Sequence, residues 1–214
     1  MGEAGSPAKA GDPALGRPGA QCHAAAGRSK LSARAANNKK RMRNPLTPLQ
    51  FARRARRLYP EREAVVDGAL RLTYRQFLER CDRWSAVLQG WGVGAGERVL
   101  VVAPNTHAML EQFYAVPQLG AIIVPVNYRL SVEDFRYLFE HSEPLVVCAH
   151  RDYLGALGPL RAQLPSVRHF VALEGAAPGW EDYEALLAAA PTDFVPAPIA
   201  EVVHPDGAAS RSSL

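Results

Sequence analysis

The sequence predicts an α/β fold with a mostly parallel sheet and helices on both of its faces. Strands that are apolar along their whole length are typical of a parallel sheet covered on both sides. A turn-forming pair, Asp67-Gly68, lies between two short β-like runs and predicts a hairpin ahead of the sheet. Four short apolar runs alternate with helical segments along the chain, at residues 98–103, 121–126, 145–149 and 169–173.

The clearest helix signal begins at residue 73. Thr73 and Gln76 have the spacing of a capping box, in which each side chain bonds the backbone N–H of the other residue. Apolar residues then recur at helical spacing through residues 74–91, which predicts one continuous buried stripe. Gly92 and Gly94 end this helix.

Other helices are predicted from the same kinds of signal. Ser131 and Asp134 repeat the capping-box spacing and predict a helix to about Glu140. Pro117 predicts a kink, because a proline within a helix removes a backbone hydrogen bond. Near Pro45 the organised part begins, and over residues 49–58 we expect apolar residues on one face and arginines on the other. Further helices are expected at residues 106–119 and 180–189, and a broken one near Gly158-Pro159.

The net charge of +4 is unevenly distributed along the 214 residues. Residues 1–43 hold nine Lys and Arg against two acids, whereas residues 44–214 hold sixteen Arg against nineteen acids. The basic character therefore belongs to the head, and the folded part is mildly acidic. This distribution argues against nucleic-acid binding, which favours a basic face on the domain itself.

All four lysines lie within the first 40 residues, and residues 41–214 contain none. The three cysteines, Cys22, Cys81 and Cys148, are widely spaced and odd in number, which favours reduced thiols in a cytoplasmic protein. No apolar run approaches the roughly 18–20 residues that a membrane helix needs. We therefore expect no transmembrane segment.

Three domains are predicted: a disordered basic head at residues 1–43, an α/β domain at residues 44–198 and a disordered tail at residues 199–214. The head is poor in acids and rich in Arg, Ala and Ser, as transit peptides are, but its Gly and Pro residues oppose their amphipathic helix. Its first six residues, MGEAGS, also fit the short myristoylation pattern, for which chance is the better explanation.

Gly92, Gly94 and Gly96 could be read as a phosphate-binding loop or as a turn. A dinucleotide fingerprint follows a strand and opens a helix, so that backbone N–H groups meet the phosphates. Here the predicted helix comes first and the strand follows, and the glycine spacing differs from the fingerprint. The turn is the better interpretation.

The histidines and cysteines form no clear catalytic or metal-binding pattern. Cys148 and His150 are two potential ligands, but structural zinc usually needs four, so a strand end is favoured. His107, beside the candidate N-caps Asn105 and Thr106, is expected to be a packing or capping residue rather than a base. The four arginines at positions 53, 54, 56 and 57 are interpreted as a solvated helix face rather than a phosphate site.

From about Asn44 to Pro198 the chain resembles the N-terminal end of the AMP-binding, adenylate-forming superfamily, above all the fatty-acid and aryl acid–CoA ligases. Three stretches carry this resemblance: LTYRQF at residues 72–77, GAGERVLVVAPN at residues 94–105, and FYAVPQLGAIIVPVNYRL at residues 113–130. Their order and spacing make the assignment specific. The resemblance implies that the α/β domain is an incomplete N-terminal subdomain of such an enzyme.

In the resembling family, a carboxylate attacks ATP to form an acyl adenylate, and the thiol of CoA then displaces AMP. The family's phosphate loop ends in Pro-Lys-Gly and should follow soon after residues 194–200, where this chain instead reads EVVHPDGAASR. Arginine does not simply replace a positioned lysine. The resemblance therefore assigns no catalytic, cofactor-binding or metal-binding residue here, and Arg129 is given no role toward CoA.

The sequence thus predicts a truncated acid–CoA ligase that does not itself make acyl adenylate. ATP, Mg²⁺ and CoA are cofactors of the complete family members, and none is expected for this chain. An alternative is a non-catalytic interaction module, with self-association through surface that the missing portion would cover. A third alternative is a fragment with no stable fold of its own.

Overall fold

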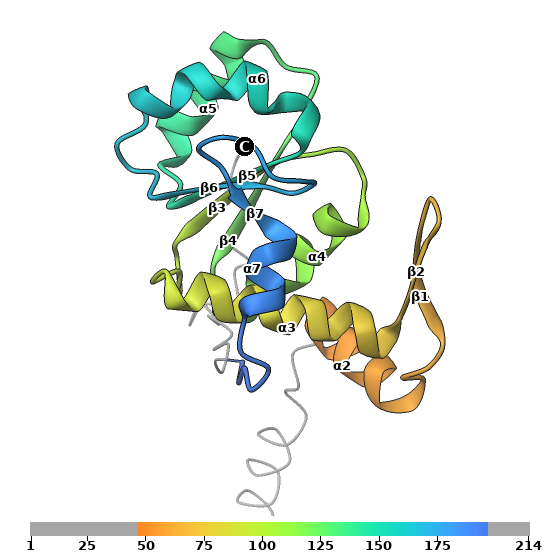
Figure 1. Ribbon diagram of the computed structural model, residues 1–214. Coiled ribbons are helices and arrows are strands. Elements are labelled where there is room, and N and C mark those ends of the chain that lie inside the picture. The colour runs from red at the N-terminus through yellow and green to blue at the C-terminus, as the bar shows by residue number, and fades with distance from the viewer. Residues whose placement is uncertain (1–46, 197–214) are drawn as a thin grey trace, which may run out of the picture. The chain divides into compact units, whose positions relative to one another are not determined.

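A computed structural model describes residues 47–196 of the chain. The predicted head at residues 1–43 and the predicted tail at residues 199–214 lie outside these described residues. The described part contains a five-stranded parallel sheet with the strand order β4-β3-β5-β6-β7 (Figure 1). Its strands are β3 (Arg98–Val102), β4 (Ile122–Val126), β5 (Val146–Ala149), β6 (His169–Ala172) and β7 (Glu181–Asp182).

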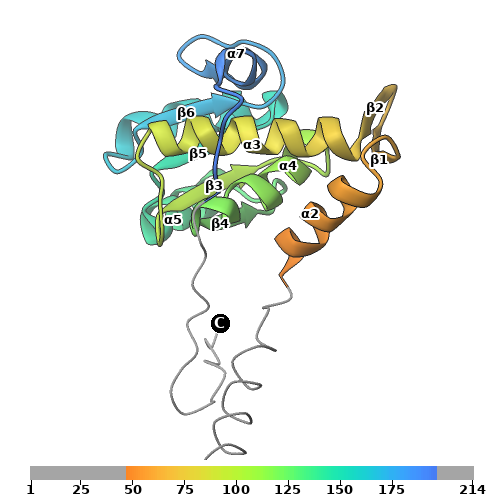
Figure 2. The same ribbon diagram turned by 90° about the horizontal axis from the view of Figure 1, so that it is seen from below.

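Helices cover both faces of this sheet, as the apolar strands predicted (Figures 1 and 2). Val99 and Val101 of β3 belong to the cluster under the first face, and Leu100 and Val102 belong to the cluster under the second. This alternation follows from the two-residue period of a strand. The first face is covered by α3 (Tyr74–Gly90), α4 (His107–Ala115) and α7 (Tyr183–Ala189), and the second by α5 (Val132–Ser142) and α6 (Leu154–Leu157).

The predicted capping boxes and the predicted hairpin are confirmed. Thr73 accepts a hydrogen bond from the backbone N–H of Gln76, whose side chain in turn accepts one from the backbone of Thr73. Ser131 and Asp134 form the same reciprocal pair at the start of α5. The hairpin consists of β1 (Glu63–Asp67) and β2 (Leu70–Thr73), which pair in antiparallel fashion.

Two predicted helices are shorter than expected. The helix over residues 106–119 ends at Ala115 and continues as the 3₁₀ turn η1 (Pro117–Leu119), because Pro117 has no N–H to extend the helical ladder. The helix expected from residue 180 begins only at Tyr183. Residues Glu181–Asp182 form β7 instead, and Asp182 caps α7 by accepting the N–H of Ala185.

The region of the predicted broken helix is a series of short turns, η2 (Arg151–Tyr153), α6 and η3 (Gly158–Gln163). At the other end of the described chain, α2 (Pro48–Leu58) packs beside α3. Its apolar residues are buried to very different degrees. Leu49 is buried, but Phe51 is 60% exposed and Leu58 is 47% exposed, because α3 covers only one side of this helix.

Candidate functional site

The strand order identifies the edge of the sheet at which α/β proteins bind ligands. The chain leaves β3 through α4 to reach β4 on one side, and β5 lies on the other side of β3. The carboxyl ends of β3 and β5 therefore form a topological switch point, where open α/β sheets place their ligand sites. Thr106 and His107 follow β3 at this edge, and His150 follows β5.

His150 is held by its own neighbours at the end of β5. It is 7% exposed, and its Nε2 lies 3.1 Å from Oε2 of Glu174. Its Nδ1 accepts the backbone N–H of Asp152 at 3.3 Å, which caps η2. Cys148 lies within β5 and is fully buried, where burial raises the pKa of its thiol. The strand-end interpretation of Cys148 and His150 is confirmed by these positions.

His107 begins α4 and binds a carboxylate from the hairpin. Oδ2 of Asp67 accepts the backbone N–H of His107 at 2.8 Å and lies 2.7 Å from its Nδ1. Nε2 of His107 lies 3.8 Å from Oε1 of Glu184 on α7. The carboxylates of Glu184 and Asp67 raise the pKa of His107 to about 9, against the opposing effect of burial. Thr106 is the N-cap of α4, so the expected capping role belongs to His107's neighbour.

A second set of charges continues directly from Glu184. Nη2 of Arg80 on α3 lies 2.6 Å from Glu184, and Nε of Arg80 lies 2.5 Å from Glu111 on α4. Glu111 is fully buried and also accepts the hydroxyl of Tyr183 at 2.7 Å. The pKa of Tyr183 is raised well above its usual value, by burial first and then by Glu111.

Together these side chains form one chain of polar contacts, which we call the polar network: Asp67, Arg80, His107, Glu111, Tyr183 and Glu184. It joins the hairpin, α3, α4 and α7, segments that are far apart in the sequence. Each member already has a partner within the network, and its carboxylates neutralise Arg80 and protonated His107. The network therefore links the hairpin, α3, α4 and α7 through ion pairs and hydrogen bonds.

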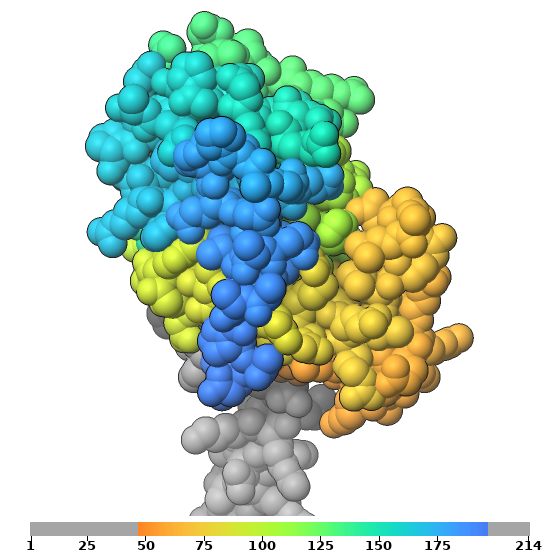
Figure 3. Space-filling view, in the orientation of Figure 1, coloured from red at the N-terminus to blue at the C-terminus, as the bar shows by residue number. Residues whose placement is uncertain are grey.

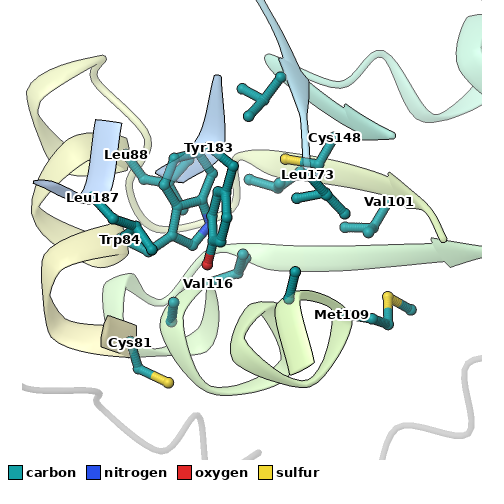
Figure 4. Packing of buried hydrophobic residues seen from close by; sticks show 14 of the residues in the cluster. Cys81, Trp84, Leu88, Val101, Met109, Val116, Cys148, Leu173, Tyr183 and Leu187 are labelled. Atoms are coloured by element: carbon teal, nitrogen blue, oxygen red, sulfur yellow. The ribbon is translucent and has the colours of Figure 1, made fainter. Parts of the chain in front are cut away.

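Aromatic packing surrounds the buried end of this network. Trp84 of α3 and Tyr183 of α7 meet edge to face, with ring centroids 4.9 Å apart (Figure 4). The indole N–H of Trp84 donates to Oε1 of Gln112 at 2.7 Å, so this buried polar atom is also satisfied. The surface view shows α7 lying over α3 (Figure 3).

Two cavities flank the polar network. One, of about 320 Å³, lies between α3 and α7, and its lining includes Gln76, Arg83 and Leu187. The other, of about 220 Å³, lies between β1 and α4, and its lining includes Val66 and Phe113. Arg80 and Glu184 border the first and His107 borders the second, so each cavity has apolar walls and a few charged groups.

The glycine-rich segment is a turn at the opposite edge of the sheet. Gly92 and Gly96 adopt positive φ angles of 84° and 82°, between the end of α3 and the start of β3. The N–H of Gly96 donates to the carbonyl of Gly120 at 3.1 Å, so this N–H already has an acceptor within the protein. This segment does not fit a nucleotide phosphate, and the turn interpretation is confirmed.

Sequence reasoning did not find the polar network. It treated His107 singly and passed over Glu111, although the two are four residues apart and share one face of α4. That spacing of ionisable residues beside apolar ones was the only available signal, because Arg80 and Tyr183 approach them through tertiary packing.

Arg129 is exposed after β4, with its guanidinium 5.5 Å from the ring centre of Tyr128.

Comparison with known proteins agrees with the fold. Over 109 residues the chain is 38% identical to a protein of Arabidopsis thaliana named probable acyl-activating enzyme 12, peroxisomal, covering 51% of this chain and 19% of that protein. Over 142 residues it is 33% identical to the long-chain-fatty-acid–CoA ligase of Thermus thermophilus, covering 64% of this chain and 26% of that protein. The chain thus spans about a fifth to a quarter of the length of these relatives.

A solved structure from Rhodopseudomonas palustris, named as a long-chain-fatty-acid CoA ligase, superposes with a TM-score of 0.66 at 31% identity. The superposition covers 72% of this chain and 38% of that one. The family described as AMP-binding enzyme matches residues 51–209, which is most of the present sequence. The chain therefore belongs to the AMP-binding enzyme family and carries an N-terminal portion of an acid–CoA ligase.

Proposed function

We propose that residues 47–196 serve as the scaffold of an AMP-dependent acid–CoA ligase of fatty-acid or aryl-acid type. The single observation that carries this proposal is the family match over residues 51–209, together with relatives named as CoA ligases. In this role the polar network fixes α3, α4 and α7 against the sheet, so that the carboxyl ends of β3 and β5 keep a constant geometry. The complete reaction would form an acyl adenylate and then an acyl-CoA.

We further propose that these 214 residues do not catalyse adenylation by themselves. Residues 41–214 contain no lysine, and the segment at residues 201–211 departs from the family's Pro-Lys-Gly loop. Adenylation needs cationic groups placed where charge develops on the phosphates. Arg80 does not supply such a cationic group, because its guanidinium forms ion pairs with the carboxylates of Glu111 and Glu184.

The test is ATP–pyrophosphate exchange with the purified chain and a panel of carboxylic acids, from acetate to long-chain fatty acids and benzoate. A complete acid–CoA ligase measured in parallel shows that the assay works, and circular dichroism shows that the chain is folded. We expect exchange no greater than in a sample without protein. Acid-dependent exchange above that level would refute the inactivity.

The second candidate function is a non-catalytic interaction module that associates with itself. It is favoured by apolar side chains that remain exposed on α4 and on the edge strand β4. Ile122 is 50% exposed, Phe113 is 41% exposed and Leu110 is 37% exposed. Edge strands and exposed apolar patches are the usual sites of association. Multi-angle light scattering decides: a monomer at all concentrations up to about 100 μM would argue against this function.

None of the helices within residues 47–196 is long and apolar enough to cross a membrane. We propose a cytoplasmic location, supported by the two buried cysteines of the described part, Cys81 and Cys148, which remain free thiols. Several relatives are named peroxisomal enzymes, so the informative comparison is between these two compartments. Co-localisation of the tagged chain with a peroxisomal marker would contradict the proposal.

A further inference from the structure

We propose that the outward face of α2 is a docking site for anionic membrane surfaces. This inference is independent of the proposed ligase function, because it concerns side chains of α2 that take no part in the polar network. It rests on three observations: the side of α2 that α3 covers, the side chains left on its other side, and the charge of the segment around it.

The first observation is that only one side of α2 is used for packing. Leu49 is buried, and Arg56 on the same side forms an ion pair with Asp82 of α3 at 2.5 Å. At 100° per residue, Phe51 and Leu58 share one strip of the helix, about 160–180° around from Leu49 and next to the half-buried Ala55. They are 60% and 47% exposed, so α2 leaves two large apolar side chains largely open to solvent.

The second observation is that arginines flank these apolar residues. At 100° per residue, Arg54 lies about 40–60° around the helix from Phe51 and Leu58, Arg57 about 100–120° and Arg53 about 140–160°. All three arginines are exposed. Within residues 47–196, these three have no ion-pair partner, in contrast to Arg56. Exposed apolar side chains next to a face of unpaired arginines are typical of a helix that lies in a membrane interface.

The third observation is the charge of the surrounding sequence. No Asp or Glu occurs between Asp12 and Glu61, whereas this stretch contains twelve Lys and Arg. Eight of them lie within residues 39–57. Such a density of positive charge is complementary to phosphatidylserine and other anionic headgroups.

The apolar residues favour a lipid surface over a nucleic acid. A polyanion would satisfy the arginines alone, and it would leave Phe51 and Leu58 in water. In a bilayer interface the same two side chains enter the boundary between headgroups and acyl chains, while the arginines meet the phosphates. Phe51 and Leu58 are separated by about 10 Å along the helix axis, so they would enter as two points of one shallow contact.

The experiment measures co-sedimentation of the full 214-residue chain with sucrose-loaded vesicles. Vesicles of phosphatidylcholine alone are compared with vesicles that contain 30 mol% phosphatidylserine. We expect binding to the anionic vesicles that weakens as salt is raised, and at least tenfold weaker binding to the neutral ones. The combined variant Arg53→Gln, Arg54→Gln and Arg57→Gln should weaken anionic binding by about tenfold or more, since each basic residue near such a surface contributes about fivefold.

A matched control removes the same charge elsewhere. Arg129, Arg151 and Arg168 are also exposed, and each follows or precedes a strand of the sheet. Their joint substitution by glutamine should leave vesicle binding within about twofold, because these residues do not lie on α2. Equal losses in the two triple variants would overturn the proposal, since binding would then depend on net charge alone. Thermal unfolding monitored by circular dichroism verifies that each variant is folded.

Two further arms separate α2 from its alternatives. Phe51→Ser with Leu58→Ser should weaken vesicle binding several-fold and leave binding to a single-stranded RNA oligomer unchanged. Equal affinity of this variant and the parent chain for anionic vesicles would overturn the proposal in favour of a general polyanion site. Glutamine at residues 39, 40, 41 and 43 tests the head: if this variant loses binding and the α2 arginine variant keeps it, the α2 site is refuted.

Discussion

The two faces of the sheet bury cores of different kinds. Under α5 and α6 the buried cluster is built from aliphatic and phenyl side chains, with Leu100, Phe135 and Phe139 at its centre. Under α3, α4 and α7 the cluster encloses Glu111 and Gln112 as well. Glu111 is bonded to Arg80 of α3 and Tyr183 of α7, and Oε1 of Gln112 accepts the indole N–H of Trp84. The stability of the core under α5 and α6 depends on close packing of apolar side chains. The stability of the core under α3, α4 and α7 depends also on the hydrogen-bond and ion-pair partners of its buried polar groups.

This difference predicts different responses to mutation and to pH. A purely apolar core loses stability in proportion to the cavity that a truncation leaves. A core that contains a charge loses stability whenever that charge loses its counter-ion, even if the volume is preserved. Substitutions on the two faces should therefore differ both in the size of the stability loss and in its dependence on pH.

The largest effect is expected in the apolar core. Phe139 is 1% exposed, and Phe139→Ala should reduce the free energy of unfolding by about 3–5 kcal/mol. Urea unfolding measures this loss as a lower midpoint with an unchanged slope. The loss should be the same at pH 6.5 and pH 9, because no ionisable partner is involved. A loss below about 1 kcal/mol would show that this face is loosely packed.

In the polar core, Arg80→Met should cost about 3 kcal/mol, the low end for a broken buried ion pair, because Arg80 is itself 22% exposed. The cost arises from the Glu111 carboxylate, which stays buried without its cation. The triple variant Arg80→Met, Glu111→Leu and Tyr183→Phe should recover most of the loss, since it removes the orphaned groups together. Equal unfolding midpoints for the single and triple variants would contradict this explanation.

A smaller, pH-dependent effect is expected at His107. Its pKa is raised from 6.5 to about 9, so protonated His107 stabilises the fold fully below pH 6.5 and loses this contribution as the pH rises to about 9. The parent chain should lose about 1–2 kcal/mol more than His107→Gln over this interval, a value reduced for the solvent exposure of Glu184. Urea unfolding at four pH values measures it, and His141→Gln on α5 provides the control.

The acidic side gives the opposite sign for Glu184. Its pKa is lowered from 4.5 to about 2, chiefly by His107 and then by Arg80. Its stabilising contribution is therefore present above pH 4.5 and is lost as the pH falls toward 2. Stability should be greatest between about pH 4.5 and 6.5. Glu184→Gln should flatten the acid limb, and it should also reduce the alkaline limb, because Glu184 helps to raise the pKa of His107.

The smallest effects compare one helix cap on each face. Thr73→Ala removes the cap of α3, and Ser131→Ala removes the matching cap of α5. Each should cost about 1 kcal/mol, because each leaves one backbone N–H of the first turn without its acceptor. Differential scanning calorimetry measures both. A cost for Thr73 that is much larger than for Ser131 would show that α3 is the more sensitive of the two helices.

Local features of the fold could be predicted from the sequence because their partners are close along the chain. The Thr73–Gln76 and Ser131–Asp134 boxes, and the Asp67-Gly68 turn, each need only three or four consecutive residues. The family resemblance was likewise carried by contiguous stretches. The short strand β7 was not predicted, because its two residues are too few to show a period. It forms because it pairs with the edge of β6.

The polar network could not be predicted in this way. Glu111 looks like a surface residue of a helix, and it is buried only because Arg80 reaches it from α3 and Tyr183 from α7. These partners are 31 and 72 residues away, so no local pattern links them. The exposure of Phe51 could not be predicted for a related reason, since the apolar pattern of α2 does not say which side α3 will cover.

By itself, the sequence determined the α/β class, the order of the main strands and helices, the hairpin, the helix caps and the family. These follow from residue periodicity, capping chemistry and contiguous motifs, which act over a few residues. Only the tertiary structure decided which strand is central, which charges are buried together and which face of α2 is free. Those outcomes depend on desolvation and packing between distant segments, and they are settled only when the chain has folded.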